Sequence, residues 1–142
     1  AFYTNERLLP QIKLAVDSNL LNTNDLKEVE RLCKQLGNIC PTEPATLIHG
    51  DLWSGNYVAA GGEEAVLIDP SVSYAHREMD LAMTQLFGGF ERSFYYHYQN
   101  IYPLEMGYEE RVPIYQLYYL LVHVNLFGGS YVDVVRKILQ RF

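Results

Sequence analysis

Three side chains that carry oxygen ligands lie near the middle of the sequence. Asp51 and Asn56 belong to the string HGDLWSGN at 49–56, and Asp69 follows the apolar run at 65–68. Ligands that offer only oxygen suit a hard cation such as Mg²⁺ better than they suit zinc. Phosphoryl transfer needs such a set, because one carboxylate orients the attacking hydroxyl while other oxygens hold the metal against the nucleotide phosphates.

A purely structural interpretation of these residues is also open. His49-Gly50-Asp51 could form a tight turn that Asp51 caps, and Asp69-Pro70 could be an ordinary strand end. For each residue taken alone, the structural interpretation is the better one. The combination of all three, with apolar β-prone runs on both sides, favours a reaction site.

The elements around these residues are expected to form a β-hairpin. Residues 47–48 and 57–58 are short β-prone pieces, and a Gly-Gly turn at 61–62 precedes the run at 65–68. Two short strands joined by such a turn predict a hairpin over roughly 57–69. The hairpin would bring the loop with Asp51 and the strand end with Asp69 to one edge of the sheet.

The rest of the chain has helical spacing of apolar residues. The first two predicted helices span 4–21, with Thr4 as the cap, and 24–36, with Asn24 or Asp25 as the cap and Gly37 as the stop. After the hairpin, helices are expected near 77–87, 91–101, 109–126 and 131–141. The fold class is therefore mainly α with a small β-hairpin (α+β), in a single lobe over 1–142.

Composition excludes several classes of protein. The net charge of −6 comes without a basic stripe, which argues against a nucleic-acid partner. The longest apolar stretch, 117–122, is too short to span a bilayer, so no membrane partner is expected. Cys33 and Cys40 lack the spacing of a zinc site, and we expect reduced thiols in a cytoplasmic protein.

Several motifs resemble known kinases. HGDLWSGN resembles the catalytic loop H-G-D-x-x-x-x-N of the aminoglycoside phosphotransferase-like kinases, and IDP at 68–70 resembles the metal-binding strand end that corresponds to DFG in protein kinases. REMDLAMTQLFGGF at 77–90 and YQLYYLLVHVNLFGGSY at 115–131 resemble the fructosamine (ketosamine) kinases more narrowly. The resemblance covers nearly the whole chain. It implies the C-terminal lobe of a protein-kinase-like fold, with ATP and Mg²⁺ as cofactors.

The resemblance also implies roles for individual residues. Asp51 matches the catalytic aspartate, and Asn56 and Asp69 match the magnesium ligands. His49 and Asp80 match residues that support the catalytic loop, and Asp80 is expected to be buried and to accept hydrogen bonds from backbone amides near His49 and Gly50.

Other candidates are weaker. Trp53 could stack on a sugar or could be a core aromatic residue, and Arg77 could line the mouth of the substrate site, although a solvated helix start is the preferred interpretation for it. The tyrosines at 95, 96, 98 and 102 are expected to belong to core and rim.

The parts of a kinase that cover the nucleotide are not recognisable in this sequence. No glycine-rich loop precedes a suitable strand, and every lysine falls in a predicted helix. The resemblance implies that these parts form a preceding N-terminal lobe, so the isolated chain is expected to be inactive and to self-associate or to dock on a partner.

The leading hypothesis for the complete enzyme is phosphorylation of the 3-hydroxyl of a small or protein-bound ketosamine, a sugar joined to an amine by glycation, as in deglycation or metabolite repair. A kinase of another hydroxyl substrate, such as an aminoglycoside or choline, remains open. So does a non-catalytic interaction module. A metal-dependent hydrolase would normally have more His or carboxylate ligands near Asp51.

Overall fold

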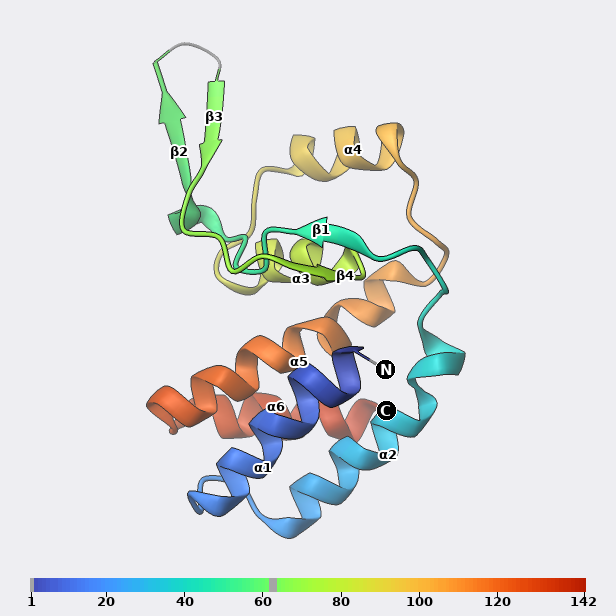
Figure 1. Cartoon of the computed structure of the whole chain (residues 1–142), viewed down its shortest axis with the longest axis vertical. Helices are drawn as coiled ribbons and strands as arrows, with labels where there is room; N and C mark the ends of the chain where they lie inside the picture. Colours follow the sequence, from blue (N-terminus) through green and yellow to red (C-terminus); the bar gives the residue numbers. More distant parts are fainter. Residues whose placement is uncertain (1, 62–63) are drawn as a thin grey trace. The chain divides into compact units, whose positions relative to one another are not determined.

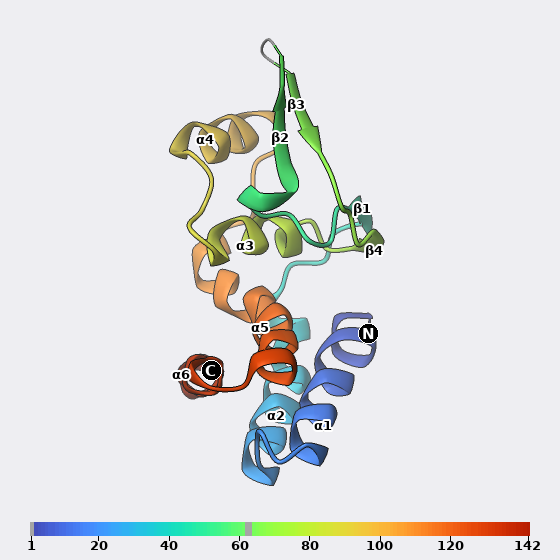
Figure 2. The same ribbon diagram turned by 90° about the vertical axis from the view of Figure 1, so that its left-hand side faces the viewer.

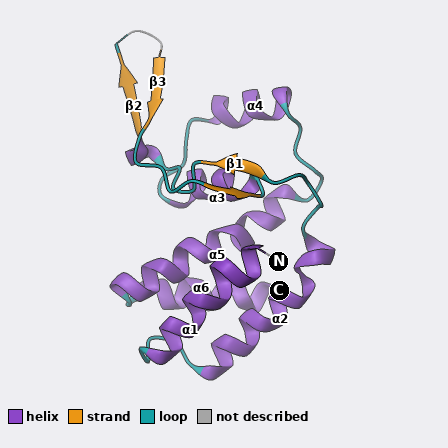
Figure 3. Ribbon diagram, in the orientation of Figure 1, coloured by secondary structure: helices purple, strands orange, loops and turns teal. Residues whose placement is uncertain are grey.

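The computed structural model describes residues 2–61 and 64–142. It contains helices throughout and two small antiparallel sheets, as Figure 3 shows in purple and orange. The chain divides into two compact units. The first unit consists of the residues up to Thr42 together with Pro113–Phe142, and the second unit consists of Glu43–Val112.

The first unit is a bundle of helices from both ends of the chain (Figure 1). Its elements are η1 (Tyr3–Leu8), α1 (Leu9–Asp17), α2 (Thr23–Ile39), most of α5 (Tyr108–Phe127) and α6 (Ser130–Arg141). The first of these, η1, is a π-helix that runs directly into α1. The apolar faces predicted from helical spacing meet in a core in which Leu8, Ile12, Val29, Leu117, Leu121, Val124 and Val135 are fully buried.

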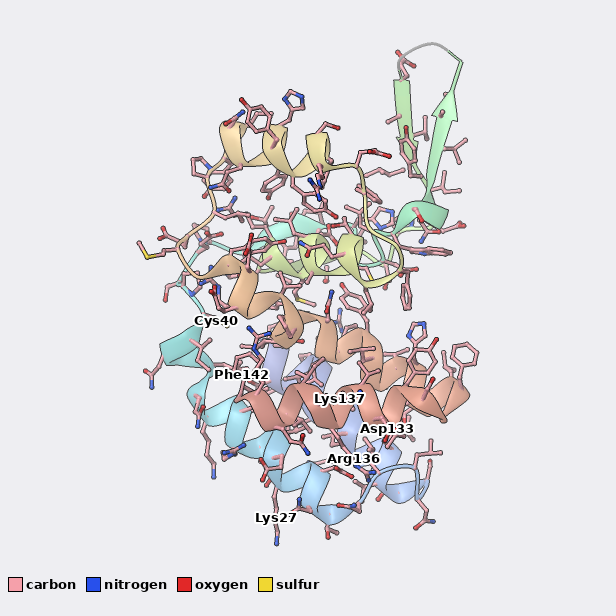
Figure 4. The ribbon with its side chains drawn as sticks, turned by 180° about the vertical axis from the view of Figure 1, so that it is seen from behind. Lys27, Cys40, Asp133, Arg136, Lys137 and Phe142 are labelled. Atoms are coloured by element: carbon pink, nitrogen blue, oxygen red, sulfur yellow. The ribbon has the colours of Figure 1, made fainter. Side chains whose placement is uncertain are left out.

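Polar contacts also join the two ends of the chain in this unit. The Tyr3 hydroxyl donates to the main-chain oxygen of Ile114 at 2.6 Å, which connects η1 to α5. The Arg136 guanidinium, labelled on α6 in Figure 4, donates to both carboxylate oxygens of Asp25 on α2 at 3.0 and 2.9 Å. The bundle is thus fixed by long-range bonds that local sequence patterns do not reveal.

The expected helix caps in this unit were wrong. The cap of α2 is Asn22, whose Oδ1 accepts from the amides of Asn24 and Asp25, while Asp25 Oδ2 accepts from the Asn22 amide. This reciprocal capping box satisfies donors that have no partner within the helix. The predicted stop at Gly37 lies inside α2, because a glycine costs a helix only about 1 kcal/mol relative to alanine. Thr4 lies inside η1 and caps nothing.

The second unit contains both sheets. Strand β2 (Tyr57–Ala60) pairs with β3 (Glu64–Leu67), and β1 (Thr46–Ile48) pairs with β4 (Ser73–Ala75), each antiparallel. Figure 2 shows the β2–β3 hairpin standing away from the β1–β4 pair. The predicted hairpin strands are confirmed, and of the predicted Gly-Gly turn Gly62 lies outside the described residues. Strand β4 was not predicted, because a strand of only three residues gives no clear sequence signal until β1 pairs with it.

In the first unit, the helix predicted over 4–21 ends at Asp17, and the helix predicted over 24–36 continues to Ile39. Helices also complete the second unit. They are α3 (Glu78–Leu86), α4 (Arg92–Ile101) and the start of α5, all within a residue of their expected positions, and the same holds for α6. Cys33 and Cys40 form no disulfide with each other. Among the helices that the structure describes, none has the length and apolarity needed to cross a bilayer.

Candidate active site

Two hydrogen bonds join Asn56 to Asp51 in the predicted site. Asn56 ends the short helix η2 (Ser54–Asn56), and its Nδ2 donates to the main-chain oxygen of Asp51 at 2.9 Å and to Asp51 Oδ2 at 3.0 Å. Both of these Asp51 atoms are acceptors, so the nitrogen of the Asn56 amide must face them. The Oδ1 of Asn56 therefore points away from Asp51 and is available as an oxygen ligand.

Asp69 is brought to the same loop by main-chain bonds on either side of it. The amide of Ile68 donates to the Asn56 oxygen at 3.0 Å, and the amide of Ser71 donates to the His49 oxygen at 2.8 Å. Asp69 itself has a φ of 50°, in the left-handed region, and its side chain is exposed. Such a conformation costs about 1–3 kcal/mol and persists only where neighbouring structure enforces it. The flanking bonds supply that constraint here.

His49 is tied to the loop through both ring nitrogens. Its Nε2 lies 2.9 Å from the Ile68 oxygen and must donate to it, and its Nδ1 accepts from the Asp51 amide at 3.3 Å. This pattern fixes the tautomer with the proton on Nε2. The ring has no nitrogen left for a substrate proton, so its contacts match the expected role of loop support.

Gly50 allows the loop to pass close to the segment after β3. Its φ is 83°, and a Cβ built at this position would lie 1.9 Å from the main-chain oxygen of Ser71. No side chain fits there without moving the backbone. The close approach is the reason that the loop and the Asp69 segment can lie side by side.

Asp80, on α3, accepts both hydrogen bonds that the sequence predicted. Its Oδ2 accepts from the His49 amide at 2.7 Å, and its Oδ1 accepts from the Gly50 amide at 2.8 Å. The residue is half-buried, not fully buried as expected. Burial raises the pKa of Asp80 above the ordinary value, and the two amide bonds oppose that rise. The carboxylate anchors the start of the loop at 49–56 to a helix.

Trp53 packs against Gly55 of this loop and against Phe87, which follows α3. Its ring lies over Gly55, where a Cβ would come within 2.2 Å of a ring carbon, and it meets the ring of Phe87 edge to face at 6.3 Å. About a third of Trp53 stays exposed. The ring is thus partly packed and partly exposed, which fits both the stacking and the packing interpretations.

Arg77 is not available to a substrate. It is 5% exposed, and its Nε and one terminal nitrogen donate to the Glu43 carboxylate at 2.8 and 2.9 Å. Its two terminal nitrogens donate to the main-chain oxygens of Tyr102 and Pro103, each at 2.8 Å. Neither the substrate-mouth interpretation nor the solvated helix start is supported, because the guanidinium is used entirely within the fold.

A second buried ion pair was also missed by the sequence analysis. Glu78 is fully buried, and its two carboxylate oxygens accept from the Nε and a terminal nitrogen of Arg111, on α5. Sequence spacing gave no signal for either pair, since the partners are 34 and 33 residues apart. The adjacent residues Arg77 and Glu78 thus each pair with a side chain of opposite charge, Glu43 and Arg111 respectively.

The arrangement can position a hydroxyl group and bind a hard cation. Asp51 offers a carboxylate whose orientation Asn56 fixes, while Asn56 Oδ1 and the exposed Asp69 carboxylate offer oxygen ligands. Over 2–61 and 64–142, no group of three or more His, Cys, Asp or Glu side chains could hold a metal ion by itself. A cation here would have to complete its shell with oxygens from a ligand, as nucleotide phosphates provide.

Comparison with known proteins identifies relatives of this chain. The family model described as fructosamine kinase matches residues 1–142. A protein from Lactiplantibacillus plantarum assigned as a ketoamine kinase is 47% identical over 99% of the chain, and a protein-ribulosamine 3-kinase of the Arabidopsis thaliana chloroplast is 36% identical over 99% of it. The chain spans 51% and 43% of these two relatives, so it corresponds to about half of their length.

A solved structure shows the same architecture. The crystal structure of a protein from Thermobifida fusca assigned as a fructosamine-3-kinase superimposes with a TM-score of 0.87 and 40% identity. The match covers 98% of this chain and 50% of that one. The expected fold class, a mainly helical lobe of a kinase-like fold with small antiparallel sheets, is confirmed.

Proposed function

Because this chain belongs to the fructosamine kinase family, we propose that the protein containing it transfers the γ-phosphoryl group of ATP to the 3-hydroxyl of ketosamines. The observation that carries the proposal is the paired contact of Asn56 with Asp51 beside the segment of Asp69. The names of the relatives support ketosamines as the substrate class.

In the proposed reaction, Asp51 is the catalytic residue. The Asn56 amide holds Asp51 Oδ2, so the other carboxylate oxygen can accept the proton of the sugar hydroxyl. The hydroxyl oxygen forms a bond to the γ-phosphorus as the bond between that phosphorus and ADP breaks. The protein's contribution is positioning and electrostatic stabilisation, which dominate catalysis of phosphoryl transfer.

Asn56 and Asp69 would hold Mg²⁺ in this site. The donor set fits, because Asn56 Oδ1 points away from Asp51 and the Asp69 carboxylate is exposed on an adjacent fixed segment. When bound, Mg²⁺ would neutralise charge on the nucleotide phosphates. His49, Gly50 and Asp80 act on the reaction indirectly by holding the loop.

This chain spans only about half the length of its relatives. We propose that the rest of the nucleotide site is formed by the part of the full-length protein that corresponds to their unmatched half. We therefore expect the isolated chain to show no turnover and only weak affinity for Mg·ATP. The exposed apolar side chains of Tyr57, Val58, Val66 and Leu67 on the hairpin support the further expectation of self-association or of docking on an N-terminal lobe. The absence of a disulfide between Cys33 and Cys40 is compatible with the reducing cytoplasm.

Phosphate transfer by the full-length protein tests the proposal. A synthetic fructosamine and its 3-deoxy analogue should be compared by ³¹P NMR, and only the first should give a phosphate ester. An aminoglycoside and choline serve as competing acceptors. Turnover of either one at a higher kcat/KM than the fructosamine, or phosphorylation of the 3-deoxy analogue, would contradict the proposed substrate.

A calorimetric titration of this chain with Mg·ATP tests the expectation for the isolated lobe. Submicromolar affinity, or steady turnover of a ketosamine by the chain alone, would show that it needs no second lobe.

A further inference from the structure

A hollow lined by aromatic rings lies in the second unit, apart from the catalytic loop residues. Its volume is about 500 Å³, and the residues that line it come from α3, α4, the segment 102–107 and the start of α5. We call it the tyrosine pocket after the four tyrosines in its wall, Tyr95, Tyr96, Tyr98 and Tyr108. Its volume is in the range of small-ligand sites, about 300–1,000 Å³.

Two of the tyrosines are fixed at their hydroxyl ends. The Tyr95 hydroxyl lies 2.9 Å from Thr84 Oγ1 and accepts from the Phe90 amide at 3.2 Å. The Tyr108 hydroxyl accepts from Gln85 Nε2 at 2.8 Å. A ring anchored in this way has little freedom to collapse into the hollow, so the wall is pre-formed.

The irregular segment between α4 and α5 is held in place by the two buried arginines. Arg77 donates to the oxygens of Tyr102 and Pro103, as described above. Arg111 donates to the oxygen of Met106 at 2.8 Å and to that of Glu105 at 3.1 Å. Four main-chain oxygens in six residues are thus satisfied by buried guanidinium groups. These hydrogen bonds hold this side of the pocket in place.

All charged side chains that line the tyrosine pocket are negative. Glu105, Glu109 and Glu110 contribute exposed carboxylates, and none of the described residues that line the pocket is Lys, Arg or His. The arginines behind the wall are paired with the carboxylates of Glu43 and Glu78, so their charges are compensated. The pocket therefore presents three carboxylates together with aromatic rings, and of these rings Tyr98 already has the Arg77 guanidinium 5.8 Å from its centroid.

We propose that the tyrosine pocket binds a cationic side chain, lysyl or arginyl, of a polypeptide substrate. An alkyl ammonium or guanidinium group gains both from ring faces and from nearby carboxylates. The aliphatic stem of such a side chain can lie along Leu81, Leu104 and Met106, which also line the pocket. A phosphate or carboxylate ligand would be repelled by the three glutamates. A metal ion is not favoured, because the described residues contain no cluster of metal-ligating side chains.

This inference rests on the proposed function and narrows its substrate class. If the sugar of a ketosamine is placed at Asp51, a glycated polypeptide still carries other Lys and Arg side chains near the glycated position. A second binding site for one of them would favour protein-bound ketosamines over free ones. Binding at the pocket should lower KM and leave kcat nearly unchanged, because the pocket residues contact no reacting atom.

Binding of a cationic side chain is tested by comparing a lysine derivative with an uncharged isostere. Nα-acetyl-lysine methylamide and Nα-acetyl-norleucine methylamide should be titrated into the ¹⁵N-labelled chain. The lysine probe should shift the amide signals of Gly107 and Tyr108 saturably, and the norleucine probe should shift them much less. Equal shifts from the two probes, or no saturable shift from either one, would overturn the cation site.

Matched variants locate the binding. The double substitution Glu109→Gln and Glu110→Gln should weaken the lysine probe by about threefold to tenfold, in line with the loss of two exposed charge pairs. The control Glu30→Gln removes an exposed carboxylate from α2, outside the pocket, and should leave the affinity unchanged. Equal affinities of the double variant and the control would refute the proposal.

Kinetics of the full-length protein separate this inference from the proposed function. Two glycated peptides should differ only by Lys or norleucine near the glycated residue, and the Lys peptide should have the lower KM. Phosphorylation of both peptides with equal KM would overturn the pocket assignment and leave the kinase function standing. Phosphorylation of neither peptide, with binding of the lysine probe intact, would refute the kinase function instead.

Discussion

The side-chain amide of Asn56 holds Asp51 at two points, the main-chain oxygen at 2.9 Å and the carboxylate oxygen Oδ2 at 3.0 Å. One residue thereby sets both the backbone and the side chain of the proposed catalytic aspartate. Because the nitrogen of the amide makes both bonds, the same side chain can offer its oxygen to a cation. In the proposed reaction, this double contact would couple orientation of the hydroxyl acceptor to metal binding.

Replacement of the proposed base tests the role of Asp51. Asp51→Asn in the full-length protein should lower kcat by several orders of magnitude and leave nucleotide affinity nearly unchanged, since the lost interaction acts mainly in the transition state. Steady-state kinetics and nucleotide titration measure the two quantities. Retention of more than about a tenth of the activity, equivalent to only ~1.4 kcal/mol, would rule out this assignment.

Asn56→Asp tests the coupling between the two residues. The substitution replaces the donor that faces Asp51 with a carboxylate oxygen, so that two negative charges would stand about 3 Å apart. We expect a large loss of kcat and an altered Mg²⁺ dependence of the rate.

Asn56→Ala is the companion variant, because it removes the amide without adding charge. It should raise the Mg²⁺ concentration needed for half-maximal rate. If neither variant changes the Mg²⁺ dependence, Asn56 is not a ligand.

The anchor of the loop should be visible in stability as well as in rate. Asp80→Ala leaves the amides of His49 and Gly50 without an acceptor, which costs about 1–3 kcal/mol in the free energy of unfolding. Asp80→Asn keeps an acceptor oxygen for one of them and should lose less. Urea denaturation of the wild type and both variants gives the comparison. An Ala variant as stable as the wild type would contradict the anchoring role.

Replacement of Gly50 should lower the stability of the fold, because this residue lies against the Ser71 oxygen. Replacement of Gly37, which has open space around it, should not. Gly50→Ala places a methyl group against the Ser71 oxygen at a positive φ, and thermal unfolding should occur at a clearly lower temperature.

The control is Gly37→Ala, inside α2, where a Cβ meets nothing within 4 Å. This variant should be more stable than wild type by up to about 1 kcal/mol. A Gly50→Ala protein that unfolds with the same midpoint as wild type would show that the loop can relax.

Two carboxylates should make stability depend on acidic pH. Hydrogen bonding to Arg136 lowers the pKa of Asp25, and hydrogen bonding to Arg77 lowers the pKa of Glu43. A lowered pKa in the folded state adds stability above the ordinary pKa, and this stability is lost as the pH falls through the folded value. The free energy of unfolding should therefore decrease as the pH drops below about 4.

The single variants Asp25→Asn and Glu43→Gln identify the source of this effect. Each should be less stable than the wild type near neutral pH and should show a shallower acid decline in denaturation curves. An acid decline as steep as that of the wild type in both variants would mean that other groups cause it.

The sequence by itself determined most of the helices and the hairpin strands, and it singled out the residues of the proposed catalytic loop. These features are local: apolar side chains repeat at helical spacing, and Asp51, Asn56 and His49 lie within eight residues of one another. The sequence also predicted that Asp69 lies near this loop, because a hairpin returns the chain to the residues that precede its first strand. The hydrogen bonds from His49 and Gly50 to Asp80 were expected from the family resemblance.

Only the tertiary structure decided the features that depend on distant partners. Strand β4 exists because β1 pairs with it. Several neighbouring residues could have capped α2, and only the side-chain geometry shows that Asn22 does so. Arg77 and Glu78 look like a solvated helix start until Glu43 and Arg111 are placed beside them. A charged side chain is buried only where a partner compensates its desolvation, and no local pattern reveals a partner more than thirty residues away.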